Sequence, residues 1–268
     1  MINDETLLRA YDEQMRGISH AERSGLLVEH DGLLLRVAGQ HRGFVTGPRD
    51  LGVTGADLDA LIARQRDFFA ARGEAVEWKT RGHDLPADLP ERLAAAGFVP
   101  EDQETVLIGV AADMAADPVL PAGVTLTEVT SDADIHEIAA LETEIWGHDW
   151  SWLADELITR KAAEPDAIEF FAVRDSRSRM VSAAWLSRYP GTEFAACMGG
   201  STLAAWRGRG IYRALVAVRA QRAVTRGVRY LQVDASADSA PILKRLGFRA
   251  VTTTTPYVWT PAQDRMPR

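Results

Sequence analysis

The segment Arg207–Tyr212 (RGRGIY) places two glycines and two arginines directly before a stretch with helical spacing. Glycines at the start of a helix let the backbone come close to a ligand, and the first helical turn has N–H groups without intrahelical partners. These donors and the helix dipole favour an anion, and a pyrophosphate fits such a site. Arg207, Arg209 and Arg213 can add charge-assisted contacts. The segment is neither Gly-x-Gly-x-x-Gly nor a P-loop, so nicotinamide cofactors and ATP are weaker candidates.

The elements that must position this segment follow from the hydrophobic spacing. Ile211–Arg226 is an amphipathic helix that stops at Gly227, and Val228–Val233 follows as a strand. A strand on each side of a long helix implies parallel strands with a right-handed crossover. Upstream, Ser131 or Asp132 caps a helix. The other expected elements are a strand at 124–129, helices to about 146 and over 153–163, and an antiparallel meander of strands at 168–173, 180–186 and 194–198.

The chain contains two copies of one pattern. Asp238 precedes Gly247-Phe248 by the same spacing as Asp88 precedes Gly97-Phe98, with an offset of 238 − 88 = 150 residues. In each copy the Asp is expected to cap a short helix, which Gly ends in a left-handed turn. A helix over 57–72 and a strand over 75–80 repeat the flanking elements. The pattern favours a domain duplication over two unrelated α/β units. The expected domains are 1–112 and 120–262, joined by a linker over 111–122 that is rich in Ala, Asp and Pro.

Composition sets further limits. The chain has 268 residues, 46% of them hydrophobic, and a net charge of 30 − 38 = −8, which argues against broad binding of nucleic acid or anionic membranes. No apolar run approaches the ~18 residues of a membrane span, and no secretory signal is evident, so a cytoplasmic protein is expected. With Cys197 as the only cysteine, no intrachain disulfide or thiolate metal cluster can form, and no metal site is expected. Cys197 lies in an apolar run and is expected to be a buried core residue.

With these motifs, the chain resembles the GNAT (Gcn5-related N-acetyltransferase) superfamily. Its pattern Arg/Gln-x-x-Gly-x-Gly/Ala at a helix start is matched by Arg207 and Gly210, and Gly247-Phe248 follows 247 − 210 = 37 residues later. The resemblance covers 120–262, and the first half resembles a degenerate copy. It implies an α/β (α+β) protein with two GNAT-like domains, each a mixed, mostly antiparallel central sheet flanked by helices.

The resemblance also implies that acetyl-CoA is the co-substrate. Its pantetheine would lie between two splayed parallel strands that end near Leu203 and Asp234, and its pyrophosphate on the helix start. Three departures stand out: Tyr212 replaces a small residue, Ser236 replaces an Asn that faces pantetheine, and Leu243 replaces a Tyr that protonates departing thiolate. The expected binding residues are Ser201, Thr202, Leu203, Arg207, Gly208, Arg209, Gly210, Ile211, Tyr212 and Ser236.

The implied chemistry is direct attack of an amine on the thioester. An alkylamine has a pKa near ~10, so a base must remove a proton before attack. Asp234 at the end of its strand and Glu193 before the other strand are candidate bases, although both could be ordinary solvated carboxylates. Tyr257 or Tyr212 could act as the acid. Three tryptophans at 146, 150 and 152 could line a pocket or plug a loop.

Two classes of function therefore remain. One is an N-acetyltransferase that acts on a small primary amine, and the alternative is a non-catalytic acyl-CoA-binding or interaction module, which Leu243 favours. The expected partners are a small-molecule amine but neither nucleic acid nor membrane, in a monomer or homodimer. The first copy has only a relic of the phosphate motif, at 49–54, and is expected not to be catalytic.

Overall fold

The computed structural model describes residues 3–17 and 26–261, and its contacts divide the chain into two compact units. Unit 1 holds the residues up to Val106, Asp234–Ala240 and the residues from Ala250 on, whereas unit 2 holds Leu107–Val233 and Pro241–Arg249. The final strand, β12 (Arg249–Trp259), therefore groups almost entirely with the first half of the chain, unlike in the contiguous domains expected from sequence. The last residue of the expected second domain, 262, lies outside the described residues.

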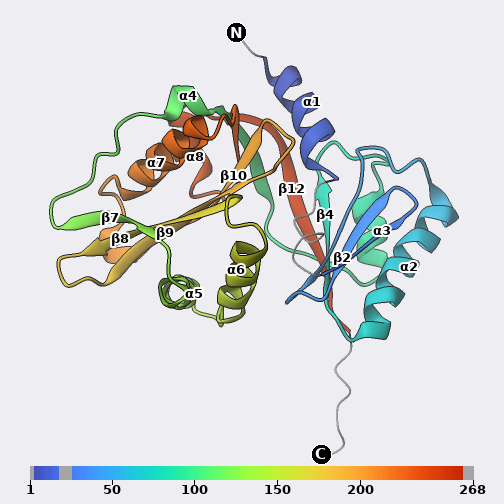
Figure 1. Cartoon of the computed structure of the whole chain (residues 1–268). Coiled ribbons are helices and arrows are strands. Elements are labelled where there is room, and N and C mark those ends of the chain that lie inside the picture. The colour runs from blue at the N-terminus through green and yellow to red at the C-terminus, as the bar shows by residue number, and fades with distance from the viewer. Residues whose placement is uncertain (1–2, 18–25, 262–268) are drawn as a thin grey trace, which may run out of the picture. The chain divides into compact units, whose positions relative to one another are not determined.

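Unit 1 is a mixed, mostly antiparallel sheet with helices packed on it (Figure 1). Its strand order is β1-β2-β3-β4-β12, in which only β3 and β4 run parallel, and β5 pairs with β12. The elements are α1 (Asp4–Met15), β1 (Leu27–Asp31), β2 (Leu34–Ala38), β3 (Gly43–Thr46), α2 (Gly55–Arg72), β4 (Val76–Arg81), α3 (Leu89–Ala95) and β5 (Val99–Pro100). Strand β6 (Glu104–Val110) begins in unit 1 and ends in unit 2.

Helix α2 and strand β4 form as the sequence predicts. The apolar face of α2 is buried through Leu58, Ile62 and Phe69, and it packs with Trp78 of β4 in one core cluster. Gly73 ends the helix in the left-handed region, with a φ of 68°. Because apolar residues recur on one side of α2 and alternate along β4, the two elements bury a shared core.

The repeated Gly-Phe unit has the expected geometry in both copies. Gly97 and Gly247 have φ values of 93° and 102°, and the phenylalanine after each is buried. The expected capping is different. Asp88 occupies the N-cap position of α3, but its carboxylate accepts from Arg92 Nε rather than from the backbone. At the second short helix, the Ser236 hydroxyl oxygen accepts from the Ser239 amide.

Unit 2 is also a mixed, mostly antiparallel sheet, in the order β11-β10-β9-β8-β7. The expected antiparallel meander is confirmed, and only β10 and β11 run parallel. Figure 1 shows α7 on one face of these strands and α5 with α6 on the other. The elements are α4 (Ala111–Met114), β7 (Val124–Val129), α5 (Asp132–Trp146), α6 (Trp152–Ala163), β8 (Ile168–Asp175), β9 (Met180–Arg188), β10 (Phe194–Thr202), α7 (Ile211–Thr225), β11 (Tyr230–Ala235) and α8 (Ala240–Arg245).

Small differences from the sequence-based expectations have local causes. Ser131 caps α5 by accepting from the Asp134 amide, as expected. The strand expected from Val228 begins at Tyr230, because the Val228 amide still donates to the Ala223 carbonyl at the end of α7. The expected linker begins with the short helix α4. No helix among the described residues is long and apolar enough to cross a membrane.

Candidate functional site

The segment Arg207–Tyr212 forms a turn between β10 and α7 in unit 2. Gly208 and Gly210 have φ values of 73° and 88°, a region that residues with a side chain rarely adopt. A Cβ atom built on either glycine would meet nothing within 4 Å. Both glycines are therefore required by the backbone, and the turn borders open space rather than packed core.

The turn presents backbone donors to that space. Among the described residues, no backbone carbonyl accepts a hydrogen bond from the amides of Gly208 and Gly210. The first turn of α7 adds amides that have no intrahelical acceptor. Since the positive end of the helix dipole lies at the same place, the turn has the electrostatic character of an anion site.

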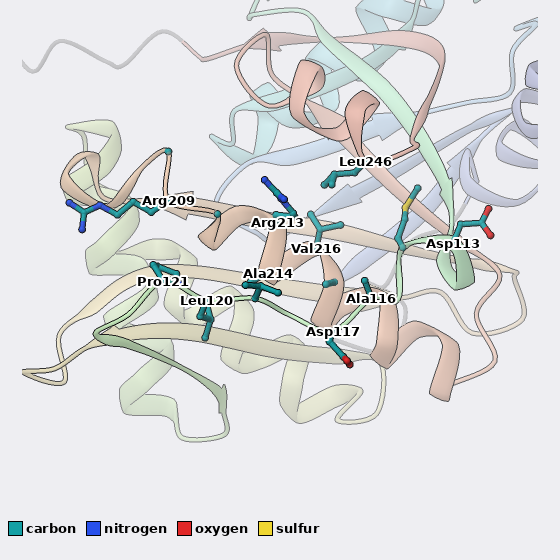
Figure 2. A pocket seen from close by; sticks show the side chains of 15 residues that line it. Asp113, Ala116, Asp117, Leu120, Pro121, Arg209, Arg213, Ala214, Val216 and Leu246 are labelled. Carbon is teal, nitrogen blue, oxygen red and sulfur yellow. The ribbon is translucent and has the colours of Figure 1, made fainter.

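A cavity of about 510 Å³ lies against this turn (Figure 2). Gly208–Gly210 and the first turns of α7 line one side, and residues 113–121 line the other. The volume is within the range of small-molecule and cofactor sites. The sequence indicated the turn, but it indicated residues 111–122 only as a connector. Their role as a cavity wall follows from the packing of this segment beside α7.

The three arginines of the motif have different positions. Arg209 and Arg213 line the cavity, and the Arg209 guanidinium also lies 5.0 Å from the centre of the Trp206 ring. Arg207 points back, because its Nε donates to the Thr202 carbonyl at 2.9 Å. Arg207 therefore ties the turn to the end of β10, and the cations available to a ligand in the cavity are Arg209 and Arg213.

Strand β10 parts from β11 before it reaches this turn. The parallel ladder covers three residue pairs, from Phe194↔Tyr230 to Ala196↔Gln232, whereas β10 continues to Thr202. A bulge between Gly199 and Ser201 also shifts the register of β10 against β9. The expectation that β10 splays from its parallel neighbour agrees with this short ladder.

The bulge in β10 requires a glycine at position 200. Gly200 has a φ of 90°, and a Cβ built on it would lie 2.7 Å from Cε2 of Tyr212. The Tyr212 ring therefore packs against the β10 backbone. The Gly-Gly pair within a strand was the available sequence signal, because glycine in a strand often marks a bulge or a close approach.

The residues expected to pair with pantetheine already have partners. The Ser201 carbonyl accepts from Ser182 Oγ at 2.7 Å, and the Leu203 amide donates to the Val181 carbonyl at 2.9 Å. The Thr202 carbonyl accepts from Arg207. The role of these three residues toward pantetheine therefore remains a prediction.

Asp234, the first candidate base, belongs to a charged cluster in unit 1. Its Oδ2 lies 2.5 Å from Nζ of Lys79 on β4. Burial lowers the pKa of Lys79, but Asp234 and Glu77 outweigh this effect, and the net pKa is raised. Burial and the Asp234 charge raise the pKa of Glu104 to about 7. Lys79 and Glu104 have no motif of their own, so the sequence did not indicate them.

The other catalytic candidates lie elsewhere. Glu193 precedes β10, and its carboxylate forms a largely exposed ion pair with Arg229 at 2.9 Å. The ~3.3 Å rise per strand residue puts it roughly 30 Å from the turn at the other end of β10. The position of Glu193 therefore does not favour its expected role as the base. Tyr257 lies opposite Trp78 in the β4–β12 ladder, and burial raises the pKa of its phenol.

Several remaining candidates have ordinary structural roles. The Ser236 hydroxyl lies 3.2 Å from that of Ser239, at the start of α8. Leu243 is fully buried in the core. Cys197 is buried as expected, and burial raises the pKa of its thiol. Among the described residues, no group of three or more His, Cys, Asp or Glu side chains is arranged to hold a metal ion.

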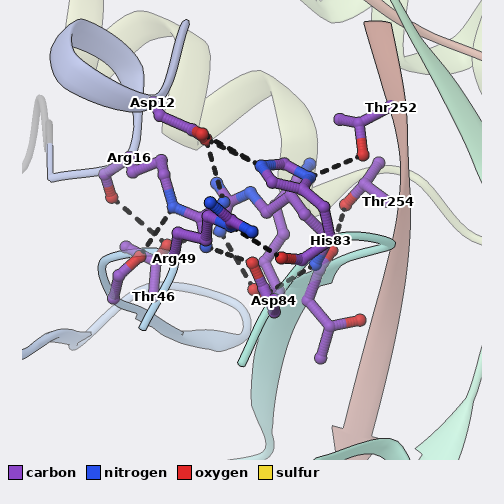
Figure 3. A network of polar contacts seen from close by, with 12 residues as sticks. Asp12, Arg16, Thr46, Arg49, His83, Asp84, Thr252 and Thr254 are labelled. Atoms are coloured by element: carbon purple, nitrogen blue, oxygen red, sulfur yellow. Dashed lines mark hydrogen bonds and ion pairs between the residues drawn. The ribbon is translucent and has the colours of Figure 1, made fainter. Parts of the chain in front are cut away.

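In unit 1, a polar network occupies the region where β3 and β4 separate (Figure 3). The β3–β4 ladder ends at Val45↔Trp78. Beyond it, Arg81 Nη1 donates to Thr46 Oγ1 at 2.7 Å, and Arg81 Nε donates to the Tyr11 hydroxyl. Arg16 is only 3% exposed and forms an ion pair with Asp84. The chain's own side chains thus occupy the region that corresponds to the splay in the second copy.

Comparison with solved structures finds many proteins of similar fold. A GCN5-related N-acetyltransferase from Kribbella flavida aligns over 98% of this chain and 95% of its own, with a TM-score of 0.66 and 18% identity. A tandem GNAT protein from the clavulanic acid biosynthesis pathway aligns over 85% and 78%, with a TM-score of 0.60 and 16% identity. A GCN5-related N-acetyltransferase from Sphaerobacter thermophilus aligns over 85% and 76%, with a TM-score of 0.61 and 17% identity.

No protein-family model and no curated protein matches the sequence. At identities below 20%, the structural similarity concerns the arrangement of helices and strands. That arrangement extends over nearly the whole chain in the Kribbella flavida alignment. The chain therefore has the fold of the GCN5-related N-acetyltransferases.

Proposed function

We propose that this protein is an N-acetyltransferase that moves an acetyl group from acetyl-CoA to a small primary amine. The observation that carries the proposal is the turn at 207–212 with its cavity. Two glycines hold its backbone in the left-handed region, its amides border open space, and Arg209 and Arg213 line the same cavity. This combination suits a diphosphate, the group that joins the pantetheine and nucleotide parts of CoA.

The reaction would be a direct transfer. The neutral amine nitrogen attacks the thioester carbonyl carbon, the C–S bond breaks, and CoA leaves as a thiolate that takes up a proton. A thiol has a pKa near ~8.5, so the thiolate is a tolerable leaving group without a dedicated acid. This property accommodates Leu243, which is buried and offers no proton where the family often has a Tyr.

The alternative is a non-catalytic acyl-CoA-binding module. Two observations favour it: the missing acid at Leu243, and the ion pair that holds the Asp234 carboxylate on Lys79. The Lys79 ammonium lies on the carboxylate oxygen that would otherwise be available to the amine. Release of free CoA thiol from acetyl-CoA in the presence of a panel of primary amines separates the two functions, because a binding module releases none.

The placement of the diphosphate is tested with Gly210→Glu. This change puts a carboxylate beside the proposed phosphate position, so we expect acetyl-CoA binding to weaken at least tenfold in calorimetry. Gly191→Glu is the matched control, since Gly191 has a φ of 86° against 88° for Gly210 and is equally free of neighbours. It lies in the β9–β10 turn, at the opposite end of β10. Equal acetyl-CoA affinity for the two folded variants would refute the placement.

A further inference from the structure

Glu142 on α5 is a buried carboxylate with one oxygen that has no partner. The side chain is only 4% exposed. Its Oε2 accepts from Trp146 Nε1 at 2.8 Å and from Ser201 Oγ at 2.7 Å. Its Oε1 is also buried, yet among the described residues it accepts no hydrogen bond. Leaving a buried charged acceptor without a hydrogen-bond donor is costly. A purely structural role for Glu142 therefore does not explain why Oε1 is buried without a partner.

The surroundings of Glu142 contain no compensating cation among the described residues. Burial is the main influence and raises the pKa of this carboxyl, whereas the hydrogen bonds from Ser201 and Trp146 lower it by less. No charged side chain contributes, either from α5 and the segment 146–152 or from α6, β9 and β10, which pack against α5. A carboxylate in this setting attracts a cationic ligand and accepts a proton more readily than an exposed carboxylate does.

Glu142 lies next to the part of β10 that has parted from β11. Ser201, which donates to its carboxylate, directly follows the glycine bulge at 199–200. In the proposed acetyl transfer, this stretch of β10 borders the thioester of acetyl-CoA. The carboxylate therefore reaches that strand from the α5–α6 face, whereas Tyr212 packs on Gly200 from α7.

The segment after Glu142 supplies aromatic surface. The Trp150 amide donates to Thr143 Oγ1 at 3.0 Å, which fixes the segment to α5. Trp150 and Trp152 stack with their ring centres 5.1 Å apart, and Trp150 Nε1 is buried without an acceptor among the described residues. The indole that contacts the Glu142 carboxylate is that of Trp146, through its Nε1.

We propose that Glu142 binds the ammonium group of the acceptor through Oε1 and accepts its proton, with Ser201 and Trp146 as positioning residues. The proposal rests on the proposed function and makes the acceptor class a primary alkylamine. An alkylammonium loses two protons when it becomes an amide. One passes to Glu142 before attack, and the other passes to the CoA sulfur as the C–S bond breaks.

Glu142→Gln tests this role with little change of shape. We expect the variant to keep its acetyl-CoA affinity, to lower kcat about 100-fold, and to bind n-alkylamines at least tenfold more weakly in calorimetry with CoA present. The wild-type kcat/KM should fall in acid as Glu142 is protonated, and this fall should disappear in the variant. Glu144→Gln is the control, because Glu144 lies on the same helix in an exposed ion pair with Arg179.

The outcomes separate this inference from the proposed function. If Glu142→Gln keeps kcat within twofold, or if its pH profile is unchanged, Glu142 is a structural residue and the acetyltransferase assignment stands without it. If the wild type binds alkylamines through Glu142 but releases no CoA thiol, the ammonium site stands and the acetyltransferase assignment fails. Absence of alkylamine binding to the wild type refutes the ammonium site directly.

Discussion

Replacing Lys79 by methionine removes the ammonium group that holds Asp234. The two side chains are 19% and 21% exposed, and their charged atoms lie 2.5 Å apart. Breaking a fully buried ion pair by removing one partner costs about 3–5 kcal/mol, because the remaining charge stays buried and unpaired. With a fifth of each side chain exposed, solvent screens part of this cost. We therefore expect Lys79→Met to lower the free energy of unfolding by about 2–3 kcal/mol.

The assay is urea unfolding at pH 7 for wild type, Lys79→Met, Asp234→Asn and the double variant. The double variant leaves neither charge unpaired, so it should lose about 1–2 kcal/mol less than the sum of the two single variants. Loss of Lys79 also removes a charge that lowers the pKa of Glu104. The destabilisation should therefore be larger at pH 8 than at pH 6.

Two results would contradict this reasoning. One is a cost below ~0.5 kcal/mol for Lys79→Met, which is typical of an exposed pair. The other is strict additivity of the single variants, which would mean that the two charges do not interact. The unfolding curves also serve the test of Asp234 in catalysis. A loss of activity in Asp234→Asn counts as loss of a catalytic group only where these curves show that the variant is folded.

Two further predictions concern Glu104 and Gly200. The folded-state pKa of Glu104, about 7, exceeds its ordinary value of 4.5, so its contribution to stability is fully present below pH 4.5 and is lost as the pH rises through 7. After discounting for partial exposure, Glu104→Gln should therefore be more stable than wild type by about 1–2 kcal/mol at pH 8 and nearly equal to it at pH 4. Urea unfolding at the two pH values measures this, and the same stability difference at both would contradict the prediction. Gly200→Ala forces a side chain into the left-handed region at a φ of 90° and against the Tyr212 ring, whereas Gly191→Ala meets only the backbone penalty of ~1–2 kcal/mol. Gly200→Ala should cost more than its control in thermal unfolding, and equal costs would show that the Tyr212 ring yields freely.

Much of the fold could be predicted from sequence because it depends on local chemistry. The spacing of Leu58, Ile62 and Phe69 on α2 is a property of one helix, and so is its end at Gly73. The repeated Gly-Phe unit is equally local, because only glycine readily adopts the φ values of 93° and 102°. These features recur with an offset of 150 residues, and on this basis a domain duplication remains a prediction from sequence.

The turn at 207–212 was the part of the candidate site that sequence could indicate. Glycines before an amphipathic helix predict a backbone turn with exposed amides, whatever lies around it. Its arginines could not be assigned in the same way. Arg207 turns back to the Thr202 carbonyl, whereas Arg209 and Arg213 line the cavity together with residues of the segment 113–121.

The charged partners of the site were decided by tertiary structure. Lys79 meets Asp234 across 155 residues of sequence, and Glu142 meets Ser201 across 59. No sequence motif marks either pair, because a single lysine or glutamate acquires its role only from the strand that the fold brings beside it. The sequence determined the helices, the strands and the glycine turn through local backbone preferences. The tertiary structure decided which charges are buried together, because burial and long-range contacts depend on the whole chain.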